Sequence, residues 1–145
     1  LRSLADVEAV REAVRDGTID VIATDHAPHH NDEKARAFAD APNGIIGLET
    51  ALAVNVTWLV KPGIVSLATL IDRMACAPAK LFHLDGGTLA KGALGDVTVF
   101  DPAREWVVDA KTFRTKGRNT PYSGKTLTGK SRLTVVGGRI AYREA

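Results

Sequence analysis

The stretch Asp20-Val21-Ile22-Ala23-Thr24-Asp25-His26-Ala27-Pro28-His29 decides the fold class of this chain. Its first half is a short apolar run with β-branched residues, and its second half holds an acid, a Pro and two histidines. A run of this length that ends at a Pro is typical of a buried parallel strand. Barrels and doubly wound sheets bind their ligands at the carboxyl ends of such strands. The stretch therefore predicts an α/β fold with polar side chains gathered at one strand end.

This polar strand end has residue types suited to metal binding or proton transfer. Asp25 is followed by imidazoles at His26 and His29. Carboxylates and imidazoles serve both as zinc ligands and as acid–base groups. A strand end capped by polar turn residues accounts for the same residues, so at this point both interpretations stay open.

Length and composition limit the classes of protein to which the chain can belong. A complete (β/α)8 barrel takes about 250 residues, whereas this chain has 145 and starts without Met, so we expect a part of a longer protein. The net charge of +2 gives no general electrostatic reason for binding nucleic acid or an anionic membrane. No apolar run approaches the roughly 20 residues that span a bilayer. The single Cys76 excludes an internal disulfide and fits a reducing, cytoplasmic compartment.

The flanking sequence predicts helices up to about residue 84. Ser3 and Asp6 resemble a capping box, and apolar residues at helical spacing lead to a stop at Gly17. A second helix is predicted from Leu48 to Leu59. A third begins after a Ser66 cap and breaks at Ala77-Pro78, and a short helix continues over Ala79–Phe82. Between the strand and the second helix, residues 31–41 are polar and predict a long active-site loop.

Beyond Asp85-Gly86-Gly87 the pattern predicts β structure instead. Short β-branched runs separated by turn residues indicate antiparallel strands. The predicted strands are Gly95–Pro102, Trp106–Val108, Leu133–Val136 and, after a Gly137-Gly138 hairpin turn, Arg139–Tyr142. Phe113–Gly129 has little periodicity and predicts an extended loop.

Two motifs together resemble one enzyme family. The segments Thr24-Asp25-His26-Ala27-Pro28-His29 and Ala41-Pro42-Asn43-Gly44-Ile45-Ile46-Gly47-Leu48-Glu49-Thr50 are similar to the last barrel strand and following loop of dihydroorotases. These are the bacterial type I enzymes of the amidohydrolase superfamily. The likeness continues through Arg118–Tyr122 and Val136–Arg139. Related hydantoinases and allantoinases share the Asp-His pair but usually lack the second His, so His29 favours the dihydroorotase branch.

The resemblance implies an architecture for the two parts of the chain. Residues 1–84 would be the C-terminal portion of the metal-dependent hydrolase barrel, of the TIM-type (β/α)8 kind. Residues 85–145 would contribute the C-terminal strands of a small β-sandwich.

The resemblance also implies a reaction and a set of site residues. The family interconverts (S)-dihydroorotate and N-carbamoyl-L-aspartate with bound zinc, in de novo pyrimidine (UMP) biosynthesis. Asp25 would be a zinc ligand and the general acid and base, while His29 and the backbone at Asn43 and Gly44 would bind the substrate carboxylate. One or two Zn²⁺ ions are expected, with the other ligands outside this chain segment. Asn43 stands where a larger apolar residue is usual, which leaves a backbone contact intact but changes the pocket wall.

Other interpretations and partners remain open in the sequence. The chain could belong to another cyclic amidohydrolase, an allantoinase or hydantoinase, or to a non-catalytic scaffold for aspartate carbamoyltransferase. The rest of the enzyme is an expected partner, with a homo-oligomer or the carbamoyltransferase as further candidates. His26 is expected to orient the loop by hydrogen bonding and Glu49 to have a structural role, whereas His30 and His83 are expected to have no role in the site.

Overall fold

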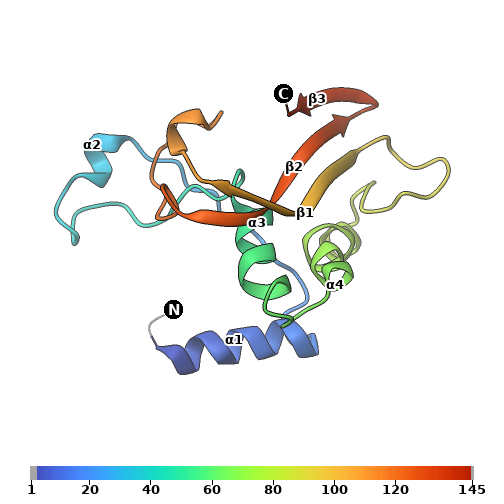
Figure 1. Ribbon diagram of the computed structural model, residues 1–145, viewed down its shortest axis with the longest axis horizontal. Coiled ribbons are helices and arrows are strands. Elements are labelled where there is room, and N and C mark those ends of the chain that lie inside the picture. Colours follow the sequence, from blue (N-terminus) through green and yellow to red (C-terminus); the bar gives the residue numbers. More distant parts are fainter. Residues whose placement is uncertain (1–2, 145) are drawn as a thin grey trace.

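The computed structural model describes residues 3–144, with helices in the first part of the chain and a sheet in the last (Figure 1). Three strands make one antiparallel sheet in the order β1-β2-β3. The helical elements are α1 (Leu4–Asp16), α2 (Asn31–Lys34), α3 (Ala51–Asn55), η1 (Val56–Val60), α4 (Leu67–Ile71), η2 (Asp72–Cys76), α5 (Ala77–Leu81) and η3 (Ala110–Thr112). The strands are β1 (Val97–Val107), β2 (Thr126–Val136) and β3 (Arg139–Arg143).

Helix α1 begins and ends where the sequence predicts. The Ser3 hydroxyl accepts a hydrogen bond from the Asp6 N–H at 3.1 Å, and the Asp6 carboxylate accepts one from the Ser3 N–H at 3.0 Å. Gly17 ends the helix in the left-handed conformation, with φ 91°. The predicted capping box and glycine stop are both confirmed.

The next helices follow the predictions with two differences. α3 and the π-helical η1 form one helix that starts at Ala51, not Leu48, and ends before Lys61. The Ser66 hydroxyl caps α4 by accepting from the Thr69 N–H at 3.0 Å, as predicted. The predicted break at Ala77-Pro78 is wrong, because helical backbone runs through η2 into α5. Pro78 lies where η2 meets α5, within this continuous helical backbone.

The segment predicted as a buried strand contains no regular strand. Residues 20–25 have no ladder partner in the described part of the chain, and a strand exists only through pairing with a neighbour. What remains of the predicted pairing is one parallel bridge between His26 and Ile45. The Ala27 N–H donates to the Ile45 carbonyl at 2.9 Å beside that bridge.

The sheet differs from prediction in how far its strands extend. Two predicted strands merge into β1, whose register against β2 shifts between Asp101 and Glu105. Because β1 is an edge strand, Pro102 costs it no ladder hydrogen bond and does not end it. β2 starts at Thr126, so the predicted loop from Phe113 to Gly129 is shorter than expected. The predicted hairpin at Gly137-Gly138 is confirmed, and both glycines have positive φ.

Packing joins the sheet to the helices through α3, which lies between the sheet and α1 in Figure 1. One core cluster contains Ile46 and Ala53 from the helical part together with Val108, Phe113 and Leu127 from the β part. A second cluster joins α1, η1 and α4 through the buried side chains of Val14, Val56 and Leu70. The division between residues 1–84 and 85–145 remains a prediction, and the first core includes residues from both sides of it.

Candidate functional site

Three loops meet on one side of the molecule and form the candidate site. The first is 25–30, directly after the segment predicted as a strand, and the second is 43–50, which precedes α3. The His26 Nδ1 atom accepts hydrogen bonds from the Gly47 N–H at 3.1 Å and the Leu48 N–H at 3.3 Å. This confirms that His26 orients the loop, and it leaves Nδ1 engaged with backbone.

The third loop, 113–120, is fastened to the other two by Glu49 and Asn119. The Glu49 carboxylate accepts from the N–H groups of Arg114 and Thr115, each at 3.1 Å. Its predicted structural role is therefore confirmed, although it holds a loop and not a helix terminus. Asn119 bonds to both of the other loops through its side chain and its carbonyl. The three loops consequently form one hydrogen-bonded unit.

The structure brings two predicted substrate-binding residues together. A Cβ added to Gly44 would lie 3.9 Å from the His29 Nε2 atom and only 2.6 Å from the Ala27 Cβ. Gly44 also has φ 97°, a conformation that glycine adopts without strain. A glycine is therefore required here both by its φ and by the closeness of Ala27.

The backbone at Asn43 and Gly44 is arranged to offer hydrogen-bond donors. The Gly44 carbonyl accepts from the Lys34 ammonium and from the Asn119 amide, both at 3.3 Å. Among residues 3–144, the N–H groups of Asn43 and Gly44 have no hydrogen-bond partner. Both residues are exposed, so these donors can reach a ligand.

Asp25 lies at the start of the first loop with its carboxylate accessible. The residue is exposed, and within residues 3–144 its side chain makes no hydrogen bond or ion pair. Its φ of 43° falls in the left-handed region, which is uncommon outside glycine but tolerated by Asp. Unusual backbone conformations of this kind concentrate at functional sites. An unpaired carboxylate in this position is free to bind a cation or to exchange a proton.

A metal ion would need more ligands than these residues supply. Within residues 3–144, no group of three or more His, Cys, Asp or Glu side chains is placed to hold a metal. The free carboxylate of Asp25 suits zinc as one oxygen ligand. Among the described residues, Asp25 could therefore supply one ligand to a metal ion, but not a complete set.

His30 and His83 were expected to have no role in the site, and both lie exposed at helix ends. His30 caps α2 by accepting from the Asp32 N–H at 3.3 Å, and its side chain is 73% exposed. His83 is exposed at the end of α5 with φ 53°. Two residues of the site were not predicted, Lys34 and Asn119. Asn119 lay in a motif that carried the family resemblance, and Lys34 lay in the predicted active-site loop of residues 31–41, but neither was given a role of its own.

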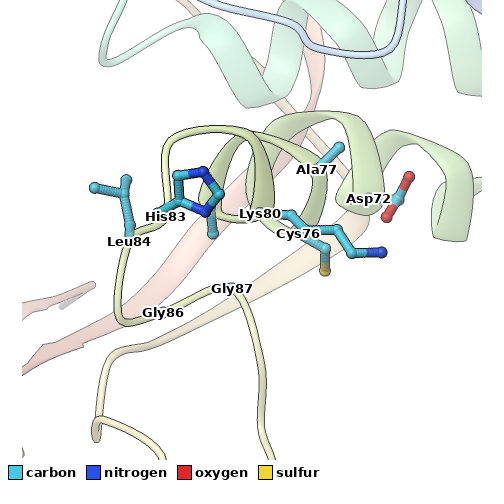
Figure 2. Close-up of a pocket in the computed structure, with 9 residues that line it drawn as sticks. Asp72, Cys76, Ala77, Lys80, His83, Leu84, Gly86 and Gly87 are labelled. Carbon is cyan, nitrogen blue, oxygen red and sulfur yellow. The ribbon is translucent and has the colours of Figure 1, made fainter.

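A separate hollow of about 510 Å³ lies between η2, α5 and the Gly86-Gly87 turn. Figure 2 shows Cys76, Lys80 and His83 along its wall, with no side chain of the three loops among the labelled residues. No hydrogen bond or ion pair joins its titratable groups in the described residues. This hollow therefore lacks the organised polar groups that mark the three-loop site.

Comparison with known proteins identifies the class first. Residues 2–141 match the Amidohydrolase family, and this chain belongs to that family. Within it, the chain is 50% identical to a dihydroorotase of Geobacter metallireducens over 143 residues. It is 51% identical to a dihydroorotase of Syntrophus aciditrophicus over 144 residues. Each alignment covers 99% of this chain and 34% of the relative, so the chain spans about a third of the length of these relatives.

Solved structures in the same family have the same backbone arrangement. The L-hydantoinase of Arthrobacter aurescens matches with a TM-score of 0.91 and 33% identity, over 99% of this chain and 33% of that one. A D-hydantoinase of Thermus sp. matches with a TM-score of 0.84 and 28% identity, over 94% of this chain and 31% of that one. The α/β arrangement described above is therefore part of a fold that these hydantoinases share. No helix within residues 3–144 combines the length and apolar character needed to cross a bilayer.

Proposed function

We propose that this chain is part of a zinc-dependent dihydroorotase that interconverts (S)-dihydroorotate and N-carbamoyl-L-aspartate. The observation that carries the proposal is that the His29 imidazole lies near Gly44, where the N–H groups of Asn43 and Gly44 have no partner among residues 3–144. This group of donors suits a substrate that carries a carboxylate. The 50% identity to dihydroorotases over nearly the whole chain supports the same activity.

The architecture belongs to the same proposal. Residues 1–84 would complete a TIM-type (β/α)8 barrel whose other strands lie in the rest of the enzyme. Residues 20–25 would then find their ladder partners there, which would explain why they form no ladder within residues 3–144. Residues 85–145 would supply strands β1–β3 to a small β-sandwich.

Asp25 would act on the proton of the attacking water. Zinc, when bound, lowers the pKa of a coordinated water toward 7 and polarises the carbonyl of the substrate. The Asp25 carboxylate would accept a proton from the water as its oxygen bonds to the ring carbonyl carbon. The same carboxyl group would then give that proton to the ring nitrogen as the carbon–nitrogen bond breaks. Its exposure and lack of a competing partner leave it free for both transfers.

His29 and the backbone at Asn43-Gly44 would hold the substrate carboxylate and set specificity. The imidazole and the two N–H groups can all donate to carboxylate oxygens. A hydantoin ring without such a carboxylate would leave these donors unpaired, and burying unpaired donors is costly. These hydrogen bonds to the carboxylate would therefore favour dihydroorotate over cyclic amides that lack a carboxylate.

The test compares two substitutions in the full-length enzyme. Asp25→Ala is expected to lower kcat by roughly a thousandfold or more, because it removes the acid–base group. His29→Ala is expected mainly to raise KM for dihydroorotate, since it removes one carboxylate contact. Turnover by each variant is followed through the ultraviolet absorbance of the substrate. Circular dichroism verifies that each variant is folded. Near-normal turnover by a folded Asp25→Ala enzyme would contradict the assignment.

A second candidate is another cyclic amidohydrolase, because the hydantoinase of Arthrobacter aurescens matches the backbone with a TM-score of 0.91. A panel of dihydroorotate, hydantoin, dihydrouracil and allantoin, assayed on the full-length parent, separates the candidates. Highest kcat/KM with dihydroorotate supports the proposal, and highest kcat/KM with a ring that lacks the carboxylate replaces it. No turnover of any of the four, in the presence of added zinc, would favour a non-catalytic scaffold.

A further inference from the structure

The Asn119 side chain lies between the two loops that carry the proposed site residues. Its Oδ1 atom accepts a hydrogen bond from the His29 N–H at 3.2 Å. Its Nδ2 group donates to the Ala27 carbonyl at 2.8 Å and to the Gly44 carbonyl at 3.3 Å. The single amide of Asn119 thus contacts both the loop that carries His29 and the loop that carries Gly44. Both loops are far from Asn119 in the sequence.

The partners of Asn119 define which way its amide points. A backbone N–H needs an acceptor and two backbone carbonyls need donors, and a carboxamide offers one acceptor oxygen and two N–H donors from one planar group. The main chain adds a further connection, because the Asn119 carbonyl accepts from the N–H of Ile46 at 3.1 Å. Ile46 is 2% exposed, so this contact ties the loop to the hydrophobic core.

The loop that carries Asn119 is itself held close to the first loop. A Cβ added to Gly117 would lie 2.9 Å from the Pro28 Cβ and 3.0 Å from the Asn119 Oδ1. Arg118 donates to the carbonyls of Thr115 and Gly117 and closes the turn before Asn119. The Asn119 side chain is therefore delivered to its partners by a tight turn with little room to adjust.

From these contacts we propose that Asn119 is a positioning residue, which sets the distance between His29 and the Gly44 backbone. The inference rests on the proposed function, in which these two groups grip the substrate carboxylate. Asn119 acts through them and touches no reacting atom. Loss of its amide lets the two loops separate, and a displacement of about 1 Å can reduce catalytic efficiency roughly a hundredfold.

The test uses the full-length enzyme with Asn119→Ala, Asn119→Asp and a matched control, Asn55→Ala. Asn55 also donates an amide hydrogen bond, at 2.8 Å, but to the Ala51 carbonyl of its own helix. Asn119→Ala is expected to raise KM for dihydroorotate roughly tenfold or more with unchanged zinc content. Asn119→Asp keeps the size of the side chain and its acceptor, but it places an oxygen where the N–H donors to the Ala27 and Gly44 carbonyls were. Its KM for dihydroorotate is therefore expected to rise at least as much as that of Asn119→Ala. The control is expected to keep the parent KM.

A double-mutant cycle with His29→Ala separates positioning from general stability. If Asn119 acts partly through His29, then Asn119→Ala should raise KM by about threefold or less when His29 is already absent. An equal effect in both backgrounds, or an unchanged KM in the single variant, would overturn the inference. If Asn119→Ala proves insoluble, the same cycle is run with Asn119→Asp.

Hydrogen exchange gives a readout that does not depend on activity. Peptides covering residues 26–47 are expected to exchange faster in Asn119→Ala. The His29 N–H loses its side-chain acceptor, and the Ile46 N–H bonds to a backbone carbonyl that is less firmly held. Peptides from α1 are expected to exchange at the parent rate. Unaltered exchange in residues 26–47 would contradict the positioning role of Asn119. A parent enzyme that fails to turn over dihydroorotate would refute the proposed function instead, with the exchange result still deciding the role of Asn119.

Discussion

At the scale of single residues, position 44 of the candidate site accepts no side chain without strain. Its φ of 97° suits glycine, and an added Cβ would overlap the Ala27 Cβ at 2.6 Å. Ala27 lies between Asp25 and His29 in the first loop. Any side chain at position 44 therefore pushes directly on the loop that carries both proposed functional side chains.

Gly44→Ala is expected to damage the site more than the fold. An L-residue in the left-handed region costs about 1–2 kcal/mol, and relief of the contact with Ala27 displaces the neighbouring loop. In the full-length enzyme we expect KM for dihydroorotate to rise roughly tenfold or more. Gly63→Ala is the control, because Gly63 has φ 76° with no atom within 4 Å of the added Cβ. Equal KM values for the two variants would show that Gly44 is a plain turn residue.

At the scale of elements, the end of β3 is held to β2 by one carboxylate. The Glu144 side chain, 15% exposed, lies 3.1 Å from the Lys130 ammonium and 2.9 Å from the Arg132 guanidinium. The Glu144 N–H also donates to the Arg132 carbonyl at 2.9 Å. The hydrogen bond from Lys130, with the nearby charges of Lys130 and Arg132, holds the pKa of the Glu144 carboxyl below its usual range.

This lowered pKa predicts a stability difference that depends on pH. A carboxyl group whose pKa is lower in the folded protein stabilises it above the unfolded pKa and loses that effect as the pH falls through the folded pKa. Glu144→Gln is therefore expected to lower Tm of the full-length protein by a few degrees at pH 7. The difference should shrink as the pH falls below the usual Glu pKa of about 4.3. Glu8→Gln, which removes the helical surface pair with Arg11, is the control and should change Tm little at either pH.

A Tm difference for Glu144→Gln that stays constant from pH 7 into the acid range would contradict this explanation. It would show that the Glu144 side chain contributes through packing and not through its charge. Circular dichroism melts at several pH values between those limits provide the measurement.

At the scale of the whole molecule, the chain leaves apolar surface open to solvent. A hollow of about 530 Å³ between α1 and the α3–η1 helix is lined mainly by apolar side chains, among them Val10, Ile22 and Trp58. Large exposed apolar residues occur elsewhere too, such as Phe38 at 100% and Leu89 at 81%. Continuous apolar surface of this kind is normally covered by another part of a protein.

We therefore expect residues 1–145, expressed alone, to be inactive and to expose apolar surface. The chain should bind the dye ANS strongly and elute from a sizing column as aggregates, whereas the full-length protein should do neither. The described residues also contain no complete metal site, so added zinc should not restore turnover. A monodisperse fragment that melts cooperatively and hydrolyses dihydroorotate would contradict this prediction.

Local chemistry explains which predictions from the sequence are confirmed. The capping box of α1, the Ser66 cap and the Gly137-Gly138 hairpin each depend on residues within a few positions of one another. His26 was expected to make hydrogen bonds from its place directly after Asp25, although its partners Gly47 and Leu48 lie 21 and 22 positions away. Asn119 could not be assigned a role, because its partners lie 75 to 92 positions away in the sequence.

The sequence by itself determined the α/β class, the family resemblance and the choice of candidate site residues, since these depend on residue type and spacing. Tertiary structure alone decided that residues 20–25 stay unpaired and that β1 runs on past Pro102. It also decided that His29 and Gly44 lie together with Asn119 between their loops. The physical reason is that strand pairing and side-chain clamps depend on groups distant in sequence, whose approach is set by packing and not by local pattern.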